Sequence, residues 1–245
     1  MIQKIRQRLT KLYLHPVRVY CLHHVCAQAN PIVTCPGDWI SEDEFIISVQ
    51  KLKDNGFRFL SLTEAYTHIK QDRIRIKNYA VLTFDDGYRS SLQIYHWLED
   101  HHIPYTLFLN AKYMDGTSAS PHIIKHARSI NPNVSLETII ADLYLSKEDL
   151  MTLSPQFSQF GSHSYEHLDA TEMQANEFAG QIHDNLSVLR QFPQFIPFHA
   201  YTWGRHTSAT NRMLNEFELI PVYMDGNTNY GPSHVIHREL FEHLH

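Results

Sequence analysis

The chain alternates short apolar runs with segments in which apolar residues recur three and four positions apart. Seven runs have the length and the branched or aromatic side chains of buried strands: 17–24, 58–62, 79–84, 104–109, 157–162, 195–201 and 219–224. The segments between them predict seven helices: 42–55, 63–70, 89–101, 137–143, 147–153, 172–191 and 207–217. Strands that alternate with helices favour a parallel sheet, and this alternation within 245 residues predicts a single-domain α/β protein with a βα barrel.

Two segments do not follow this alternation. Residues 111–136 contain Gly, Ser, Pro and Asn with little periodicity, so we expect a loop or an insertion within a barrel domain that spans 17–245. Residues 1–16 place isoleucines and leucines at helical spacing among lysines and arginines, which predicts a basic amphipathic helix. Such a helix either covers the protein surface or lies on a membrane surface.

Composition and charge exclude some classes of protein. Hydrophobic residues make up 43% of the chain, enough for a large core, and a net charge of −5 without a basic block argues against a nucleic acid partner. The chain has an odd number of cysteines, Cys21, Cys26 and Cys35, which is typical of free thiols in a reducing compartment. The N-terminal segment lacks the apolar stretch of a signal peptide. We therefore expect a cytoplasmic protein. If the basic helix lies on a membrane, it would contact the inner face.

The stretch CLHHVC, residues 21–26, looks like a metal-binding box because it combines two cysteines with two histidines. Neighbouring residues of a strand face opposite sides, however, so Cys21 and Cys26 cannot converge if this stretch is extended. His23 and His24 end the predicted strand, where one of them lines a pocket or both are structural.

The stretch TFDDGY, residues 83–88, places two carboxylates side by side directly after a predicted strand. In a βα barrel the carboxyl ends of the strands meet at one face, where the chemistry of such proteins collects. His163 and the segment YTWGR follow two other predicted strands, so we expect these polar groups at the same mouth. A bound cation would offset the repulsion between Asp85 and Asp86.

Further ligands for a cation are predicted in SHSYEH, residues 162–167. His163 and His167 are four residues apart, so on one helical turn both imidazoles would face the same side. Two imidazoles and one carboxylate leave coordination positions open, which is typical of a catalytic zinc site or a non-haem iron site.

These motifs resemble those of a known family. TFDDGY followed by HSYEH is similar to the first two motifs of the polysaccharide deacetylases, carbohydrate esterase family 4. YCLHHV resembles the opening strand of that family, and HAYTWGRHT resembles a degenerate form of its third motif. The resemblance extends over roughly residues 17 to 238. It implies a distorted (β/α)7 barrel that removes acetyl groups from sugars with a divalent metal.

The resemblance also implies roles for single residues. Asp86, His163 and His167 would hold the metal, with zinc as the first expectation and cobalt or nickel as alternatives. Asp85 would be the general base that deprotonates the attacking water. The backbone N–H of Trp203 would stabilise the oxyanion. Tyr88 and Trp203 are the aromatic residues that we expect at the mouth.

The third and later motifs depart from the family pattern. The arginine that commonly orients the base has no clear counterpart in the third motif, where Arg205 is one candidate, while Arg238 fits an arginine found at a strand end in related members. The histidine that protonates the leaving group is also missing from its usual motif. His237 is the residue that we predict as a catalytic substitute, with Asp225 as a second candidate.

We therefore predict a metal-dependent hydrolase that removes acetyl groups from an N-acetylated sugar or polysaccharide precursor. Its partner is a carbohydrate that carries an N-acetyl group. One alternative is a C–N hydrolase of small amides on the same fold. Another is a carbohydrate-binding barrel with impaired catalysis, which the departures from the later motifs suggest.

Overall fold

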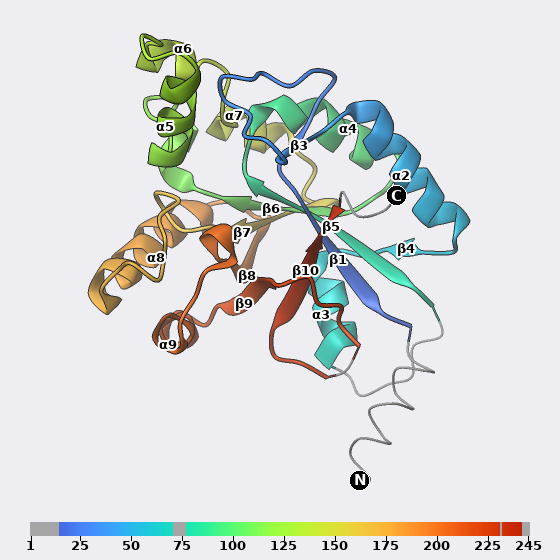
Figure 1. Cartoon of the computed structure of the whole chain (residues 1–245). Coiled ribbons are helices and arrows are strands. Elements are labelled where there is room, and N and C mark those ends of the chain that lie inside the picture. The colour runs from blue at the N-terminus through green and yellow to red at the C-terminus, as the bar shows by residue number, and fades with distance from the viewer. Residues whose placement is uncertain (1–14, 71–76, 231, 242–245) are drawn as a thin grey trace.

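The computed structural model describes residues 15–70, 77–230 and 232–241 (Figure 1). The basic helix predicted at 1–16 falls almost wholly outside these residues. Among the helices that they contain, none is long and apolar enough to cross a membrane.

Seven parallel strands of the described residues close into a barrel (Figure 1). They are β1 (Val17–Leu22), β5 (Tyr79–Asp86), β6 (Tyr105–Leu109), β7 (Ser158–Ser162), β8 (Phe195–Ala200), β9 (Ile220–Met224) and β10 (Ile236–Leu240). The ring closes because β1 pairs with β5 on one side and with β10 on the other. It is distorted, since the register shifts between β7 and β8 and the β1–β10 pairing includes only two residue pairs. The predicted (β/α)7 barrel is confirmed.

One barrel strand differs from the prediction. The run expected at 58–62 forms only the short strand β4 (Arg58–Phe59), which pairs with β5 outside the ring. The seventh barrel strand is instead β10, whose sequence IHREL is too polar to be recognised as a buried strand. Its inward-facing charge, Arg238, is nevertheless 1% exposed.

Helices surround the barrel close to their predicted positions (Figure 1). They are α2 (Glu42–Asp54), α3 (Leu62–Lys70), α4 (Leu92–Asp100), α6 (Leu136–Ile140), α7 (Lys147–Thr152), α8 (Ala175–Leu189) and α9 (Ser208–Glu216). Three 3-10 helices, η1 (Arg89–Ser91), η2 (Ala111–Asp115) and η3 (Thr202–Gly204), follow the ends of β5, β6 and β8. The short strands β2 (His24–Val25) and β3 (Trp39–Ile40) pair with each other outside the barrel.

The segment expected as a loop at 111–136 is partly helical. It contains α5 (Pro121–Ile130), whose first turn is capped by the Ser120 hydroxyl and begins with a proline. Proline in the first turn is a start signal for a helix rather than a sign of a loop. Ile123 of this helix packs in a small apolar cluster with Val33 from the segment that follows β1. This cluster stands beside the mouth of the barrel.

The barrel interior is filled at its N-terminal end. Inward-facing residues such as Val81 and Phe198 share one apolar cluster with Leu62 and Ile69 of α3, which covers this end. Packing is tight enough that a Cβ on Gly161 would lie 2.5 Å from the Phe108 ring. Function is therefore expected at the opposite, C-terminal mouth.

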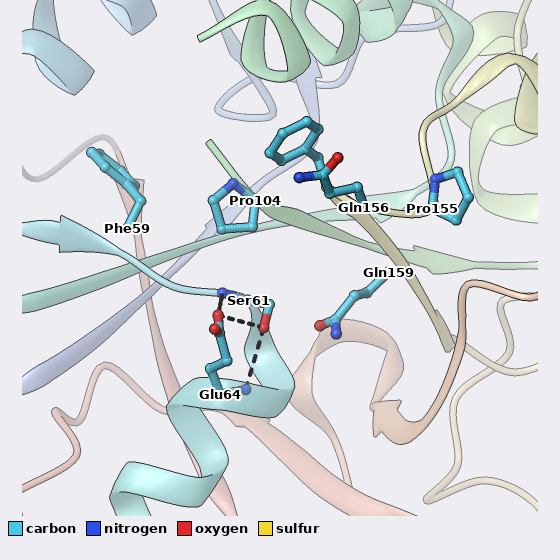
Figure 2. Close-up of a pocket in the computed structure, with 8 residues that line it drawn as sticks. Phe59, Ser61, Glu64, Pro104, Pro155, Gln156 and Gln159 are labelled. Atoms are coloured by element: carbon cyan, nitrogen blue, oxygen red, sulfur yellow. Dashed lines mark hydrogen bonds between the residues drawn. The ribbon is translucent and has the colours of Figure 1, made fainter. Parts of the chain in front are cut away.

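A depression of about 340 Å³ lies at the covered end (Figure 2). Phe59, Pro104 and Phe157 contribute to its wall. Its acidic side chain, Glu64, accepts hydrogen bonds from the Ser61 backbone and hydroxyl as part of the start of α3. These contacts stabilise the start of the helix, and they do not form a catalytic site.

Candidate metal centre and active site

Strand β5 delivers both carboxylates to the mouth of the barrel. Thr83 and Asp85 face the interior, and Asp86 is the last residue of the strand, with a left-handed φ of 69°. Gly87 continues this turn at φ 74°, where an added Cβ would also lie 2.6 Å from the Leu109 side chain. A left-handed backbone at a residue such as Asp86 is strained, and strain of this kind collects at functional sites. Asp85 and Asp86 are 4% and 9% exposed.

Both predicted histidines reach Asp86. The Nε2 atoms of His163 and His167 lie 3.4 Å and 3.0 Å from Asp86 Oδ1. One ligand-type atom from each of the three residues lies within 4.8 Å of the others. The two histidines are in a loop and not on the helical turn that their spacing suggested. Left-handed φ values at Ser164 and His167, 64° and 53°, turn the chain back so that the imidazoles converge.

The hydrogen bonds and charges of this group fit a divalent cation. Nδ1 of His163 lies 2.8 Å from the Ala200 carbonyl oxygen, which can only accept, so Nδ1 carries the proton and Nε2 is free to coordinate. Asp86 Oδ1 is buried and accepts no hydrogen bond within the described part of the chain. Burial opposes ionisation of Asp86, but the positive charge that His167 and His163 would carry without a bound cation holds its pKa well below the usual value. An ionised carboxylate oxygen without a donor, facing two imidazoles, is a suitable cation ligand.

Asp85 is in a different electrostatic environment. Arg238 donates to its two oxygens from Nη1 and Nη2 at 2.6 Å and 2.8 Å, and Nη1 also donates to Thr83 Oγ1 at 3.1 Å. Burial alone would raise the pKa of Asp85, but the Arg238 guanidinium lowers it to about 2. The ion pair keeps Asp85 charged and fixed beside the candidate metal ligands.

Arg238, on β10, therefore makes the contact with Asp85 that the resemblance led us to expect from an arginine of the third motif. The other candidate, Arg205, is directed elsewhere, because its Nη1 donates to Asp169 Oδ2 at 2.6 Å. The sequence offered only a weak signal for Arg238, since an arginine at a strand end has many other uses.

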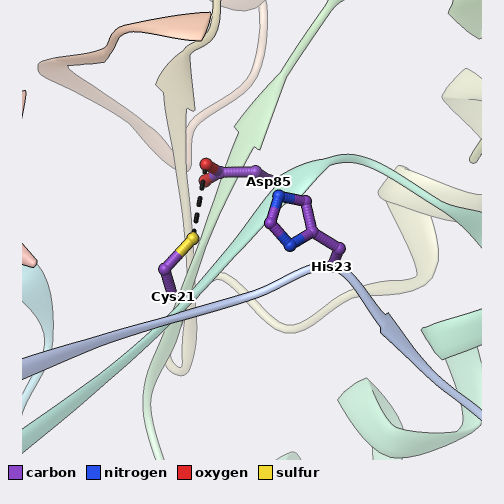
Figure 3. Close-up of side chains that lie close together, drawn as sticks. All are labelled: Cys21, His23 and Asp85. Atoms are coloured by element: carbon purple, nitrogen blue, oxygen red, sulfur yellow. Dashed lines mark hydrogen bonds between the residues drawn. The ribbon is translucent and has the colours of Figure 1, made fainter. Parts of the chain in front are cut away.

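Cys21 and His23 approach Asp85 from the end of β1 (Figure 3). The Cys21 thiol donates to Asp85 Oδ2 at 3.5 Å. This group does not fit a cation, because Asp85 is already neutralised by Arg238 and burial raises the pKa of the thiol well above its usual value. The end of β1 does, however, place the His23 imidazole next to Asp85. Cys26 bonds separately to the Gln28 carbonyl, so the two cysteines of CLHHVC do not converge.

Trp203 lies at the mouth, as the sequence suggested. It follows β8 with a left-handed φ of 52° and is 47% exposed, and its ring centroid is 5.0 Å from that of His167. His122 of α5 extends the same rim, 5.7 Å from the Trp203 ring. Tyr88 does not present an aromatic surface there, because it is 3% exposed and stacks on His24 at 3.7 Å.

His237 is not brought to the carboxylates. It precedes Arg238 on β10, and neighbouring residues of a strand face opposite sides, so the inward position of Arg238 turns His237 outward. Its Nδ1 lies 2.7 Å from Asp225 Oδ2, and its ring contacts Tyr223. The two residues predicted to replace the missing acid thus bind each other on the outside of the barrel.

Comparison with known proteins identifies the family of the chain. The family described as "Polysaccharide deacetylase" matches residues 72–222, which is more than half of the chain. The chain belongs to the polysaccharide deacetylase family. Among curated proteins, none matches the sequence.

Solved structures share the fold at low sequence identity. IcaB from Ammonifex degensii aligns with a TM-score of 0.72 and 17% identity over 93% of each chain. The Streptococcus pyogenes deacetylase PplD, solved in complex with acetate, aligns with a TM-score of 0.73 and 17% identity over 92% of this chain and 91% of its own. BC0361, a polysaccharide deacetylase from Bacillus cereus, aligns with a TM-score of 0.67 and 14% identity over 92% of this chain and 64% of its own.

Proposed function

We propose that this protein is a metal-dependent deacetylase that releases acetate from N-acetylated sugars. The observation that carries the proposal is the convergence of Asp86, His163 and His167 beside the Asp85–Arg238 ion pair, at the mouth of a barrel of this family. Asp86, His163 and His167 would hold the cation, with zinc, cobalt and nickel as the candidates. When bound, the cation would polarise the acetyl carbonyl and lower the pKa of water toward ~7.

Asp85 is the proposed general base. Its carboxylate is ionised at neutral pH, and Arg238 holds it in one orientation. It accepts a proton from the attacking water as the new C–O bond forms at the acetyl carbon. The backbone N–H of Trp203 is the proposed donor to the oxyanion, since this residue lies against His167.

His23 is the proposed acid in place of His237. A ring nitrogen of His23 lies within 4.8 Å of an Asp85 oxygen, so the two groups flank one small volume. His23 donates a proton to the sugar nitrogen as the C–N bond breaks, which leaves acetate and a free amine. Histidine is the side chain most often used for such a proton transfer.

The first test is the metal content of the purified protein by elemental analysis. Wild type should contain about one divalent ion per chain, and His163→Ala should lose it because one of three ligands is removed. His183→Ala is the matched control, since that side chain is 73% exposed. Wild type that stays metal-free after incubation with zinc, cobalt or nickel would contradict the proposed centre.

The second test is acetate release from N-acetylated sugars and polymers. Asp85→Asn should keep the metal and lose activity, and His23→Gln should lose most of it. Asp184→Asn, on an exposed side chain, should keep both. A fully active Asp85→Asn would show that the base is wrongly assigned.

A further inference from the structure

The loop that carries both histidine ligands lacks the usual sources of support. Strand β7 ends at Ser162, so residues 163–167 are in neither a strand nor a helix. Two of these five residues, Ser164 and His167, have left-handed φ values. A non-glycine residue in this conformation is strained and persists only where its surroundings determine it. Contacts from outside the loop must therefore hold it.

Asn110 provides the central contact. It follows the last residue of β6, is 3% exposed, and donates from Nδ2 to the carbonyl oxygens of His163 and Ser164 at 2.5 Å and 3.0 Å. One amide group thus binds the carbonyls of the two peptide units that flank Ser164, the first left-handed residue of the loop.

The position of Asn110 in the chain would favour a different use of its side chain. It is the residue before η2, where an asparagine usually accepts a hydrogen bond from the first turn of a helix. Here the side chain makes no such bond, and Oδ1 has no hydrogen-bond partner among the described residues. The hydrogen bonds of the amide go to the histidine loop instead.

Neighbouring residues complete the support. The Glu166 backbone donates to Gln181 Oε1 at 2.8 Å and accepts from the Tyr113 hydroxyl at 2.8 Å. Asn185 of α8, which is fully buried, accepts from the Ala111 backbone N–H at 2.8 Å and donates to the Leu109 carbonyl oxygen at 2.9 Å. These two bonds fix the chain on both sides of Asn110.

We infer that Asn110 is a positioning residue of the metal centre: its amide holds the strained loop in the conformation that turns His163 and His167 toward Asp86. The inference rests on the proposed function, since positioning has a chemical consequence only if the three residues bind a cation. Without the amide, His163 and His167 would still be present, but the backbone of their loop could relax to unstrained conformations.

The test is cobalt binding to metal-free protein, measured by titration calorimetry and by the visible spectrum of bound Co²⁺. Asn110→Ala should weaken the Kd by about 10–100-fold, the range for residues that orient metal ligands. Asn110→Asp should bind at least as weakly, because it places carboxylate oxygens against two carbonyl oxygens. Tyr113→Phe, a gentler change that removes one hydroxyl contact with the same loop, should fall between these variants and wild type.

Asn133→Asp is the matched control, because Asn133 is exposed and distant in sequence from the loop. Circular dichroism and thermal unfolding of the metal-free proteins show which variants fold. If the folded variants lose thermal stability but keep the Kd and the Co²⁺ spectrum of wild type, the role is merely structural and the inference is wrong. If wild type itself binds no cobalt, the proposed function fails and the inference with it. If wild type binds Co²⁺ and His163→Ala does not, the proposed metal centre holds, and the Asn110 variants then test the positioning role by itself.

Discussion

Replacing Arg238 by methionine should destabilise the barrel strongly. The substitution keeps an extended, flexible side chain next to the Phe108 ring but removes the guanidinium. Asp85 would then be a carboxylate at 4% exposure without a cation. Removing one partner of a buried ion pair costs about 3–5 kcal/mol, because the remaining charge stays buried.

The pKa of Asp85 gives a second measure of the same interaction. A pKa of about 2 in the folded protein, against the ordinary value of 3.8, corresponds to roughly 2–3 kcal/mol of net stabilisation of the charged form. This net value already includes the opposing effect of burial, so removing Arg238 should cost at least this much at pH 7. Because the pKa is lowered on folding, the stabilisation is fully present above pH ~4 and is lost as pH falls toward 2. The difference between wild type and variant should therefore narrow in acid.

The measurement is urea denaturation of metal-free protein, followed by circular dichroism. The double variant Asp85→Asn with Arg238→Met should recover much of the loss, since neither charge remains. A midpoint and slope for Arg238→Met equal to those of wild type would refute the reasoning. So would a double variant no more stable than the single one, because the loss would then come from packing and not from the unpaired carboxylate.

Three further changes test the packing, a helix start and the response to pH. Gly161→Ala should cost about 1–3 kcal/mol in thermal unfolding, because its Cβ would meet the Phe108 ring at 2.5 Å, and Phe108→Leu in the same chain should recover part of this; no loss in the single variant would contradict the contact. Ser120→Ala should cost about 1 kcal/mol in urea, since the hydroxyl caps α5, and an unchanged midpoint would show that the cap is unimportant. Burial lowers the pKa of His24 to about 3, so its contribution to stability is lost as pH falls below ~6.5, by about 2 kcal/mol at pH 5. His24→Gln should lack this part of the pH dependence when the free energy of unfolding is measured with urea at pH 7, 6 and 5. If that free energy falls equally with pH in both proteins, the prediction is wrong.

The hydrophobic pattern predicted most of the barrel, and β10 shows where it could not. A buried strand was recognisable where apolar residues predominate, as in β5 and β6. In β10 one inward residue is Arg238, which is buried only because Asp85 lies opposite it. Such pairing depends on residues far apart in the chain, so periodicity alone gives no sign of it. The polar composition of α5 concealed a helix in the same way, although the proline at its start was a usable signal.

The candidate site was predictable in its residues but not in its geometry. The acidic pair and the histidine spacing pointed to Asp86, His163 and His167, and the structure brings these together. The expected helical turn is absent because Ser164 and His167 are left-handed, a conformation that residue type predicts with certainty at no residue other than glycine. An asparagine after a strand suggests a helix cap, so no sequence pattern indicated that Asn110 binds the loop.

The ion pair between Asp85 and Arg238 joins residues 153 positions apart, and this has a consequence for synthesis of the chain. At ribosomal rates of about 5–20 residues per second, the arginine follows the aspartate by on the order of 10–30 s. His167 is made well before Arg238, so a nascent chain contains every candidate metal ligand while Asp85, the proposed base, has no arginine beside it. Pairing of β10 closes the barrel and brings Arg238 to Asp85 in the same step. Under the proposed function, an unfinished chain would contain the residues that bind the metal ion but not the arginine that fixes the base.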